Sequence, residues 1–178
     1  MERNELAQAI YRASHLTGQF RLRSGATASE YFDKYLFESD PALLGAIVEH
    51  LAPLMPADID ALAGLELGGV PIATMLAQQT GLPAYFVRKE QKLYGTCRLV
   101  EDGPIAGQRL LIVEDVVSSG GQIALSTRDL RGLGATVDHA LCVIDRESGG
   151  PEALAAEDVK LSPLFLMSEL LDQQTPAG

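Results

Sequence analysis

Residues 110–121 carry side chains whose types and order suit the binding of a phosphorylated sugar. Four apolar residues are followed by Glu114 and Asp115, two valines, two serines and two glycines. Small residues let backbone N–H groups approach an anion, and a helix that begins after them would add its partial positive charge. The two acids would repel a bare phosphate, so their expected partners are sugar hydroxyls or a bridging Mg²⁺. A ribose phosphate meets both demands.

This segment does not match the common nucleotide-binding loops. No Gly-Lys-Ser/Thr follows it, as a Walker loop requires, and it lacks the spaced glycines of a dinucleotide-binding turn. A purely structural alternative is that the two acids cap the following helix while the glycines form an ordinary turn.

A second glycine pair, Gly68 and Gly69, precedes a segment with helical periodicity at residues 70–80. The backbone N–H groups of such a pair can form a concavity that binds anions. The alternative is a close-packed turn without a ligand.

Residues 89–107 form a long expected loop, with 19 residues between two apolar segments. Loops of this length in compact domains usually have a function. Positive charge concentrates at its beginning, in Arg88, Lys89, Lys92 and Arg98, although the net charge of the chain is −10. We expect it to bind a pyrophosphate group, and the alternative is a solvated surface loop.

An alternation of apolar and helical segments must position these loops. Strands are expected at residues 59–65, 84–87, 110–113 and 137–144, and helices at residues 70–80 and about 122–130. This alternation is typical of a doubly wound, mainly parallel α/β sheet. Loops at the carboxyl ends of its strands converge on one crevice, so the acidic, basic and glycine-rich loops should meet there.

The first forty residues do not follow this alternation. Asn4 could cap a helix that Thr17 and Gly18 end, and residues 20–23 alternate as in a short strand. Asp40 and Pro41 predict the start of a helix that runs to about Pro53. We expect one domain, residues 1–178, with about residues 1–40 and the last twenty packed on the sheet as additions.

The composition of the chain argues against several classes of protein. The chain has 178 residues with 24 acidic and 14 basic side chains, which argues against binding to nucleic acid or a membrane surface. Its two cysteines, Cys97 and Cys142, have no metal-ligand spacing. Residues 1–8 are polar and charged, which argues against a signal peptide and favours a cytoplasmic location.

Several motifs together resemble a known family. Residues 111–121 are similar to the signature of type I phosphoribosyltransferases, which bind phosphoribosyl pyrophosphate through an acid-acid-hydroxyl-glycine loop. Residues 20–25, 88–95 and 143–147 narrow the resemblance to the orotate phosphoribosyltransferases. The resemblance implies a type I phosphoribosyltransferase-like fold, in which about residues 1–40 form a small N-terminal hood over the base.

The resemblance also implies how phosphoribosyl pyrophosphate is held. Lys89 would act in its own subunit, whereas Arg88 and Lys92 would reach the neighbour's site, giving a homodimer with shared active sites. The catalytic residues would be Lys89, Lys92 and Asp115. Mg²⁺ would arrive with the pyrophosphate group, without direct protein ligands. The full set implied for this substrate is Gly68, Gly69, Arg88, Lys89, Lys92, Tyr94, Glu114, Asp115, Val116, Val117, Ser118, Ser119, Gly120, Gly121 and Gln122.

Two positions depart from the family pattern. Tyr94 stands where the family commonly has histidine, and a phenol carries no positive charge at neutral pH. Gly68 stands where many relatives have lysine. One cation that would face the pyrophosphate is therefore missing.

For the base, the resemblance assigns Arg146 to the carboxylate or carbonyl edge of orotate and Ser118 to a nearby hydrogen bond. Arg23, Tyr31 and Phe32 would form the hood over the ring. Arg146 follows an apolar segment, where a bidentate carboxylate ligand would compensate its charge. The alternative is an ion pair with one of its acidic chain neighbours.

The implied reaction joins orotate and phosphoribosyl pyrophosphate to give orotidine 5′-monophosphate and pyrophosphate. It needs no covalent nucleophile. One alternative is a phosphoribosyltransferase for another base, which would alter the hood around Arg23 and Phe32. Another is a regulator of this fold that binds nucleic acid, which the net charge of −10 argues against.

Overall fold

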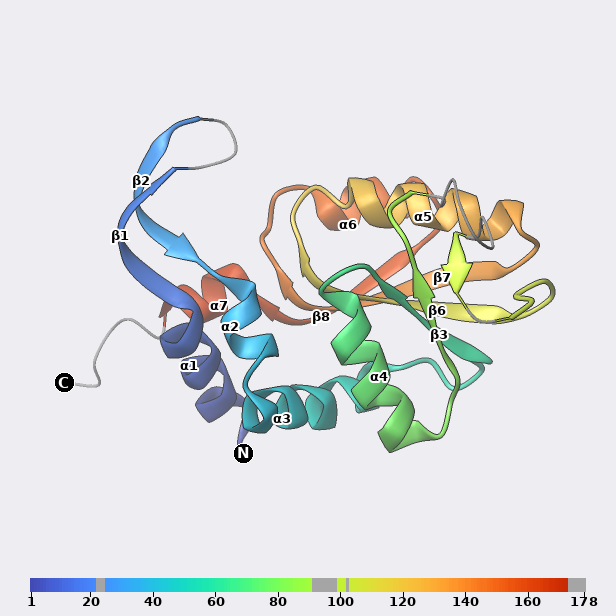
Figure 1. Ribbon diagram of the computed structural model, residues 1–178, viewed down its shortest axis with the longest axis horizontal. Coiled ribbons are helices and arrows are strands. Elements are labelled where there is room, and N and C mark those ends of the chain that lie inside the picture. The colour runs from blue at the N-terminus through green and yellow to red at the C-terminus, as the bar shows by residue number, and fades with distance from the viewer. Residues whose placement is uncertain (22–24, 91–98, 102, 173–178) are drawn as a thin grey trace.

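The computed structural model describes residues 1–21, 25–90, 99–101 and 103–172. Its centre is a six-stranded sheet with the order β5-β4-β3-β6-β7-β8 (Figure 1). The pairs along β4, β3, β6, β7 and β8 are parallel, and only β5 pairs antiparallel with its neighbour. The strands are β3 (Ala61–Leu65), β4 (Ala84–Val87), β5 (Val100–Glu101), β6 (Arg109–Val117), β7 (Thr136–Asp145) and β8 (Lys160–Leu166). The predicted doubly wound, mainly parallel sheet is confirmed.

Helices cover both faces of this sheet. In Figure 1, α5 (Gly121–Gly132) and α6 (Gly150–Ala155) lie above it, and α3 (Pro41–Leu51) and α4 (Gly69–Thr80) lie below. Leu111 and Val113 of β6 belong to one core cluster, and Leu110 and Ile112 belong to the other. Because successive side chains of a strand point to opposite faces, both sets are buried, which explains the uninterrupted apolar run.

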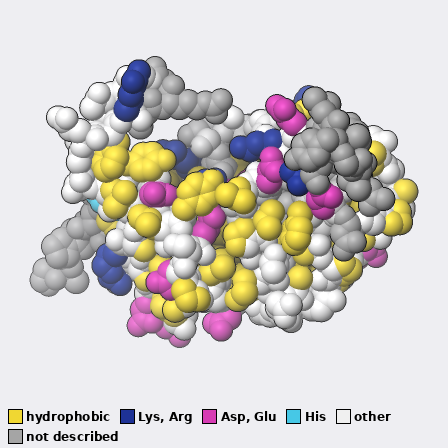
Figure 2. Space-filling view, viewed as in Figure 1, with side chains coloured by type: hydrophobic (Ala, Val, Ile, Leu, Met, Phe, Trp, Pro, Cys, Tyr) yellow, Lys and Arg dark blue, Asp and Glu magenta, His cyan; other side chains and the backbone are white. Residues whose placement is uncertain are grey.

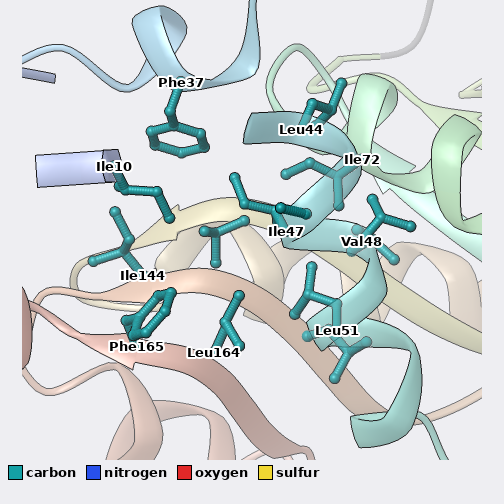
Figure 3. Close-up of a cluster of buried hydrophobic side chains, with 14 of the residues drawn as sticks. Ile10, Phe37, Leu44, Ile47, Val48, Leu51, Ile72, Ile144, Leu164 and Phe165 are labelled. Carbon is teal, nitrogen blue, oxygen red and sulfur yellow. The ribbon is translucent and has the colours of Figure 1, made fainter. Parts of the chain in front are cut away.

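Figure 3 shows the core on the lower face. Ile47, Val48 and Leu51 of α3 belong to the same buried cluster as Leu164 and Phe165 of β8. The start of α3 agrees with the prediction, since the Asp40 carboxylate accepts hydrogen bonds from the N–H groups of Ala42 and Leu43.

The N-terminal segment differs from the prediction. The first helix, α1 (Arg3–Ser14), begins after Glu2 and not at Asn4, because the Glu2 N–H donates to the Glu5 carboxylate in a capping box. It also ends earlier than expected. Strand β1 (His15–Arg21) runs through Thr17 and Gly18 because the unpredicted strand β2 (Thr27–Phe32) pairs with it antiparallel. Figure 1 shows this hairpin projecting from the body of the molecule.

The C-terminal part also differs. The last twenty residues were expected to be additions, yet the whole of β8 lies among them and forms the edge strand of the sheet beside β7. Pro163 obscures this strand in the sequence, and an edge position tolerates a proline. The helix α7 (Met167–Leu171) follows it. Within the described ranges, no helix has the length and apolar character needed to cross a bilayer.

Candidate functional site

The two acids lie within β6, not after it as the sequence suggested. The ladder with β7 continues to the pair Val117 and Asp145, which extends the strand beyond Val113. Neither acid caps α5, whose N-cap is Gly120 without a side-chain hydrogen bond, so the capping alternative is wrong. Asp115 is fully buried. Its Oδ1 accepts a hydrogen bond from the Val116 N–H at 2.5 Å.

A lysine that the sequence analysis missed pairs with Asp115. It lies on the short helix α2 (Lys34–Glu38), whose two end residues are four apart and share a face. The Lys34 Nζ is 2.5 Å from the Asp115 Oδ2. Glu38 is buried beside the same carboxylate. No local sequence signal connects α2 with a strand some eighty residues later.

The cluster contains one ion pair and two further acids whose pKa values are raised. Burial opposes the charge of Asp115, but hydrogen bonds from Glu114, Glu38 and Lys34 outweigh it and hold its pKa below the usual value. Burial raises the pKa of Glu38 to about 9, and a hydrogen bond with Asp115 adds to this effect. Burial, followed by the hydrogen bond with Asp115, likewise raises the pKa of Glu114 well above its usual value.

The partner of Asp115 also holds its proton. Burial lowers the pKa of Lys34, but the hydrogen bond and charge of Asp115 outweigh burial and raise it overall. Lys34 and Asp115 are therefore favoured in their charged forms, and the protonated forms of Glu38 and Glu114 are favoured.

The predicted phosphate cradle forms one pocket of about 190 Å³. Gly120 has a φ of +74°, and a Cβ there would lie 3.0 Å from the Gly150 carbonyl oxygen, so only glycine suits the turn. Asp115 lies beneath this pocket and does not line it. The predicted residues that do line it are Glu114, Val116, Val117, Ser118, Ser119, Gly120, Gly121 and Gln122.

A second pocket, of about 250 Å³, adjoins the cradle. It brings together Tyr31, Phe32, Ser118 and Arg146, four of the five residues expected around the base, and adds Lys34. The fifth, Arg23, lies outside the described residues. On the face in Figure 2, Lys and Arg side chains gather near the hollow between the hairpin and the sheet.

Arg146 is free to meet a ligand within the described part of the chain. It is exposed directly after β7, and its backbone N–H donates to the Val117 carbonyl. The neighbouring acids are engaged elsewhere: Asp145 accepts from the Glu147 N–H, and Glu147 accepts from the Ser168 N–H. The alternative of an ion pair between Arg146 and a chain neighbour is therefore not observed among these residues.

The glycine pair before α4 allows a close approach to β6. A Cβ at Gly68 would lie 1.5 Å from the Asp115 Oδ2, and one at Gly69 would lie 2.1 Å from the Val113 carbonyl oxygen. The close-packed turn is therefore present. Binding of an anion by these two residues stays a prediction.

The basic segment begins with residues that contact acids of the same chain. The Arg88 Nε is 2.9 Å from Glu101 on β5, and its guanidinium is 3.8 Å from Glu66. The Lys89 N–H donates to the same Glu66 carboxylate at 3.1 Å. The prediction of a 19-residue loop between two strands is wrong. Residues 100–101 within it form the strand β5, which pairs with β4. Lys92 and Tyr94 lie outside the described residues.

A divalent metal would find limited ligands here. The described residues contain no group of three or more His, Cys, Asp or Glu that could hold a metal ion. Asp115 is paired with Lys34, and Glu114 accepts a hydrogen bond from the Asp115 N–H. Glu114 is the carboxyl group that lines the cradle, and Mg²⁺ keeps several waters and is commonly bound by one or two carboxylates together with substrate phosphates.

Similarity to known proteins covers almost the whole chain. Residues 42–162 match the phosphoribosyl transferase domain family. The chain is 50% identical over 173 residues to an orotate phosphoribosyltransferase of Nocardioides sp., which covers 97% of this chain and 96% of that protein. Its fold is similar to the orotate phosphoribosyltransferase of Aeropyrum pernix, with a TM-score of 0.83, 33% identity, and 97% and 99% of the two chains covered.

A third similar structure contains a ligand. It is the orotate phosphoribosyltransferase of Mycobacterium tuberculosis H37Rv in complex with 5-phospho-alpha-D-ribosyl 1-diphosphate. The TM-score is 0.80 at 28% identity, with 94% of this chain and 98% of that chain covered. By sequence and by fold, this chain belongs to the orotate phosphoribosyltransferase family.

Proposed function

We propose that this protein transfers the phosphoribosyl group of phosphoribosyl pyrophosphate to orotate where the cradle and the second pocket meet. The observation that carries the proposal is that both pockets are lined by Val116 and Ser118. A sugar whose phosphate occupies the cradle would present its anomeric carbon to a base in the adjoining pocket. The complex of the M. tuberculosis relative with phosphoribosyl pyrophosphate supports this choice of donor.

The residues suggest catalysis by positioning and charge, without a covalent nucleophile. Arg146 would bind the carboxylate or carbonyl edge of orotate, with Ser118 donating nearby and Tyr31 and Phe32 covering the ring. Asp115 would accept from ribose hydroxyls and orient the sugar. A ring nitrogen then attacks the anomeric carbon as the bond to pyrophosphate breaks, and cations stabilise the departing charge.

Mg²⁺ bound to the pyrophosphate oxygens would supply further charge neutralisation when the donor binds. Glu114 and Asp115 are the carboxyl groups closest to where it would arrive. We assign this chain no dedicated metal site.

The same proposal includes a dimer. Arg88 and Lys92 would reach the pyrophosphate in the neighbour's site while Lys89 acts in its own, as the resemblance implies. The family also suggests a single domain over residues 1–178, with about residues 1–40 as the hood. The cytoplasmic location expected from the sequence belongs to this proposal as well.

A panel of bases tests the reaction. Purified protein with phosphoribosyl pyrophosphate and Mg²⁺ would be assayed for pyrophosphate release with orotate, uracil, adenine and hypoxanthine in turn. We expect release with orotate only. Release with another base, and none with orotate, would replace the proposed acceptor while leaving the donor site in place.

A further inference from the structure

Lys34 lines the base pocket and brings its ammonium group to Asp115. Its Nζ is 2.5 Å from the Asp115 Oδ2, and its side chain also lines the base pocket. The Lys34 side chain is 34% exposed, whereas the Asp115 side chain is fully buried. An ammonium has three N–H donors, so the contact with Asp115 leaves donors free to face the pocket.

The same carboxylate oxygen also borders the glycine-rich loop before α4. The Asp115 Oδ2 lies where a side chain at Gly68 would begin, 1.5 Å from the position of its Cβ. Residues 66–69 read Glu-Leu-Gly-Gly and carry no cation of their own. Lys34 therefore brings positive charge next to a loop that has no cationic side chain of its own.

Other cations border this loop without lining the two pockets, since the Arg88 guanidinium lies 3.8 Å from Glu66. Among the described residues that line the two pockets, only Lys34 and Arg146 are positively charged. Arg146 follows β7 on the side of the base, while Lys34 contacts the carboxylate beneath the cradle. A diphosphate at the anomeric carbon would lie between the base pocket and the glycine loop, within reach of Lys34.

We propose that Lys34 is a substrate-binding residue that exchanges partners. When sugar hydroxyls occupy Asp115, the Lys34 ammonium donates to anionic oxygens of the diphosphate at the anomeric carbon. This inference rests on the function proposed above. It gains support from the raised pKa values of Glu38 and Glu114, since burial disfavours their charged forms and Lys34 makes its ion pair with Asp115.

Calorimetry of inorganic pyrophosphate binding in the presence of Mg²⁺ measures this contact without any contribution from the base. Lys34→Met alone would leave the Asp115 charge buried without a cation, so the comparison is made in Asp115→Asn. We expect Lys34→Met/Asp115→Asn to bind pyrophosphate about tenfold more weakly, or worse, than Asp115→Asn, since a charge-assisted hydrogen bond is lost. Lys34→Arg in the same background should keep most of the affinity.

Two controls separate this role from a structural one. Lys160→Met in the same background removes an exposed lysine on the edge strand β8 and should leave the affinity unchanged. Ribose 5-phosphate has no diphosphate, so its affinity should not change with Lys34→Met. Equal losses for both probes would mean that Lys34 only shapes the site.

Three results would overturn the inference: equal losses for the two probes, equal pyrophosphate affinity with and without Lys34 in the Asp115→Asn background, or no binding of pyrophosphate by any variant. Because no base is present, the outcome is independent of the acceptor. A protein that fails to use orotate but shows the Lys34 effect would contradict the proposed function alone.

Discussion

Asp115 and Glu114 are adjacent acids whose pKa values shift in opposite directions. Both are buried. The Lys34 Nζ lies 2.5 Å from the Asp115 Oδ2, and the Val116 N–H donates to the Asp115 Oδ1 at 2.5 Å. Both contacts stabilise the negative charge of Asp115. Burial and the neighbouring Asp115 raise the pKa of Glu114, which favours its protonated form. We therefore expect the two residues to differ in what they contribute to the reaction.

Asp115→Asn should lower kcat/KM by roughly 10- to 100-fold, because it removes the charged acceptor for ribose hydroxyls. Glu114→Gln should have a smaller effect, since the amide resembles the neutral acid. Steady-state kinetics at saturating Mg²⁺ measure both, with thermal melting as the check on folding. Unchanged turnover in both variants would remove the acids from the site, and a collapse of the Tm would indicate a structural role.

Arg146→Ala should raise the KM for orotate at least about tenfold and affect the KM for phosphoribosyl pyrophosphate much less. Only the base carries a carboxylate for this guanidinium, which is exposed beside the pocket. The matched control is Arg128→Ala, which removes an exposed arginine of α5 that pairs with Glu157. Equal effects on the two substrates would contradict the assignment.

At the scale of elements, Glu38 of α2 is a buried acid beside Asp115 of β6, and its raised pKa favours the protonated form. Glu38 keeps its proton up to about pH 9 in the folded protein, whereas an unfolded glutamate loses it near 4.5. Between these values the unfolded state binds fewer protons than the folded state. The free energy of unfolding should therefore fall as the pH rises through this window.

Glu38→Gln should flatten this decline, because glutamine resembles the protonated acid at every pH. We expect its Tm to exceed that of the unmodified protein by a few degrees at pH 8.5, where about 1 kcal/mol corresponds to roughly 2–4 °C. Thermal melts from pH 5 to 9 give the comparison, with Glu49→Gln, at an exposed site on α3, as the control. Parallel curves for Glu38→Gln and the unmodified protein would refute the buried proton.

The turn before α4 depends on the absence of a side chain. Gly68→Ala should destabilise the protein by about 1–3 kcal/mol and lower turnover, because the new Cβ would displace the Asp115 carboxylate. Gly45→Ala is the matched control, since nothing lies within 4 Å of a Cβ there and alanine favours the helix α3 by about 0.5–1 kcal/mol. Denaturant melts and steady-state kinetics of both variants test this prediction. Unchanged stability and turnover in Gly68→Ala would contradict the close approach of Gly68 to Asp115.

At the scale of the whole molecule, the expected dimer makes each site depend on two chains. Lys92→Ala and Asp115→Asn should each retain only a small fraction of the activity alone. After subunit exchange, each heterodimer would hold one site with both residues intact, so activity should return toward a fraction of the unmodified level. Fluorescence exchange of labelled subunits verifies mixing. Verified exchange without recovered activity would mean that Lys92 acts within its own chain or outside catalysis.

The sequence by itself determined the features that depend on neighbouring residues. The continuous apolar run of β6, the helix start at Asp40 and the glycine turn at Gly120 are local patterns, and each agrees with the structure. The residues predicted to form the cradle line one pocket because they are consecutive, and phosphate binding there stays a prediction. The family could be predicted from motifs spread over the chain, because their residues and their order are read from the sequence without knowing which of them make contact.

Only the tertiary structure decided what rests on contacts between distant segments. Pairing with β7 extends β6 past the two acids, pairing with β1 creates β2, and β8 completes the sheet edge despite Pro163. The largest addition is the contact of Lys34 and Glu38 with Asp115, across some eighty residues of chain. Charge and protonation there depend on burial and on distances of a few ångströms, which no periodicity or spacing in the sequence encodes.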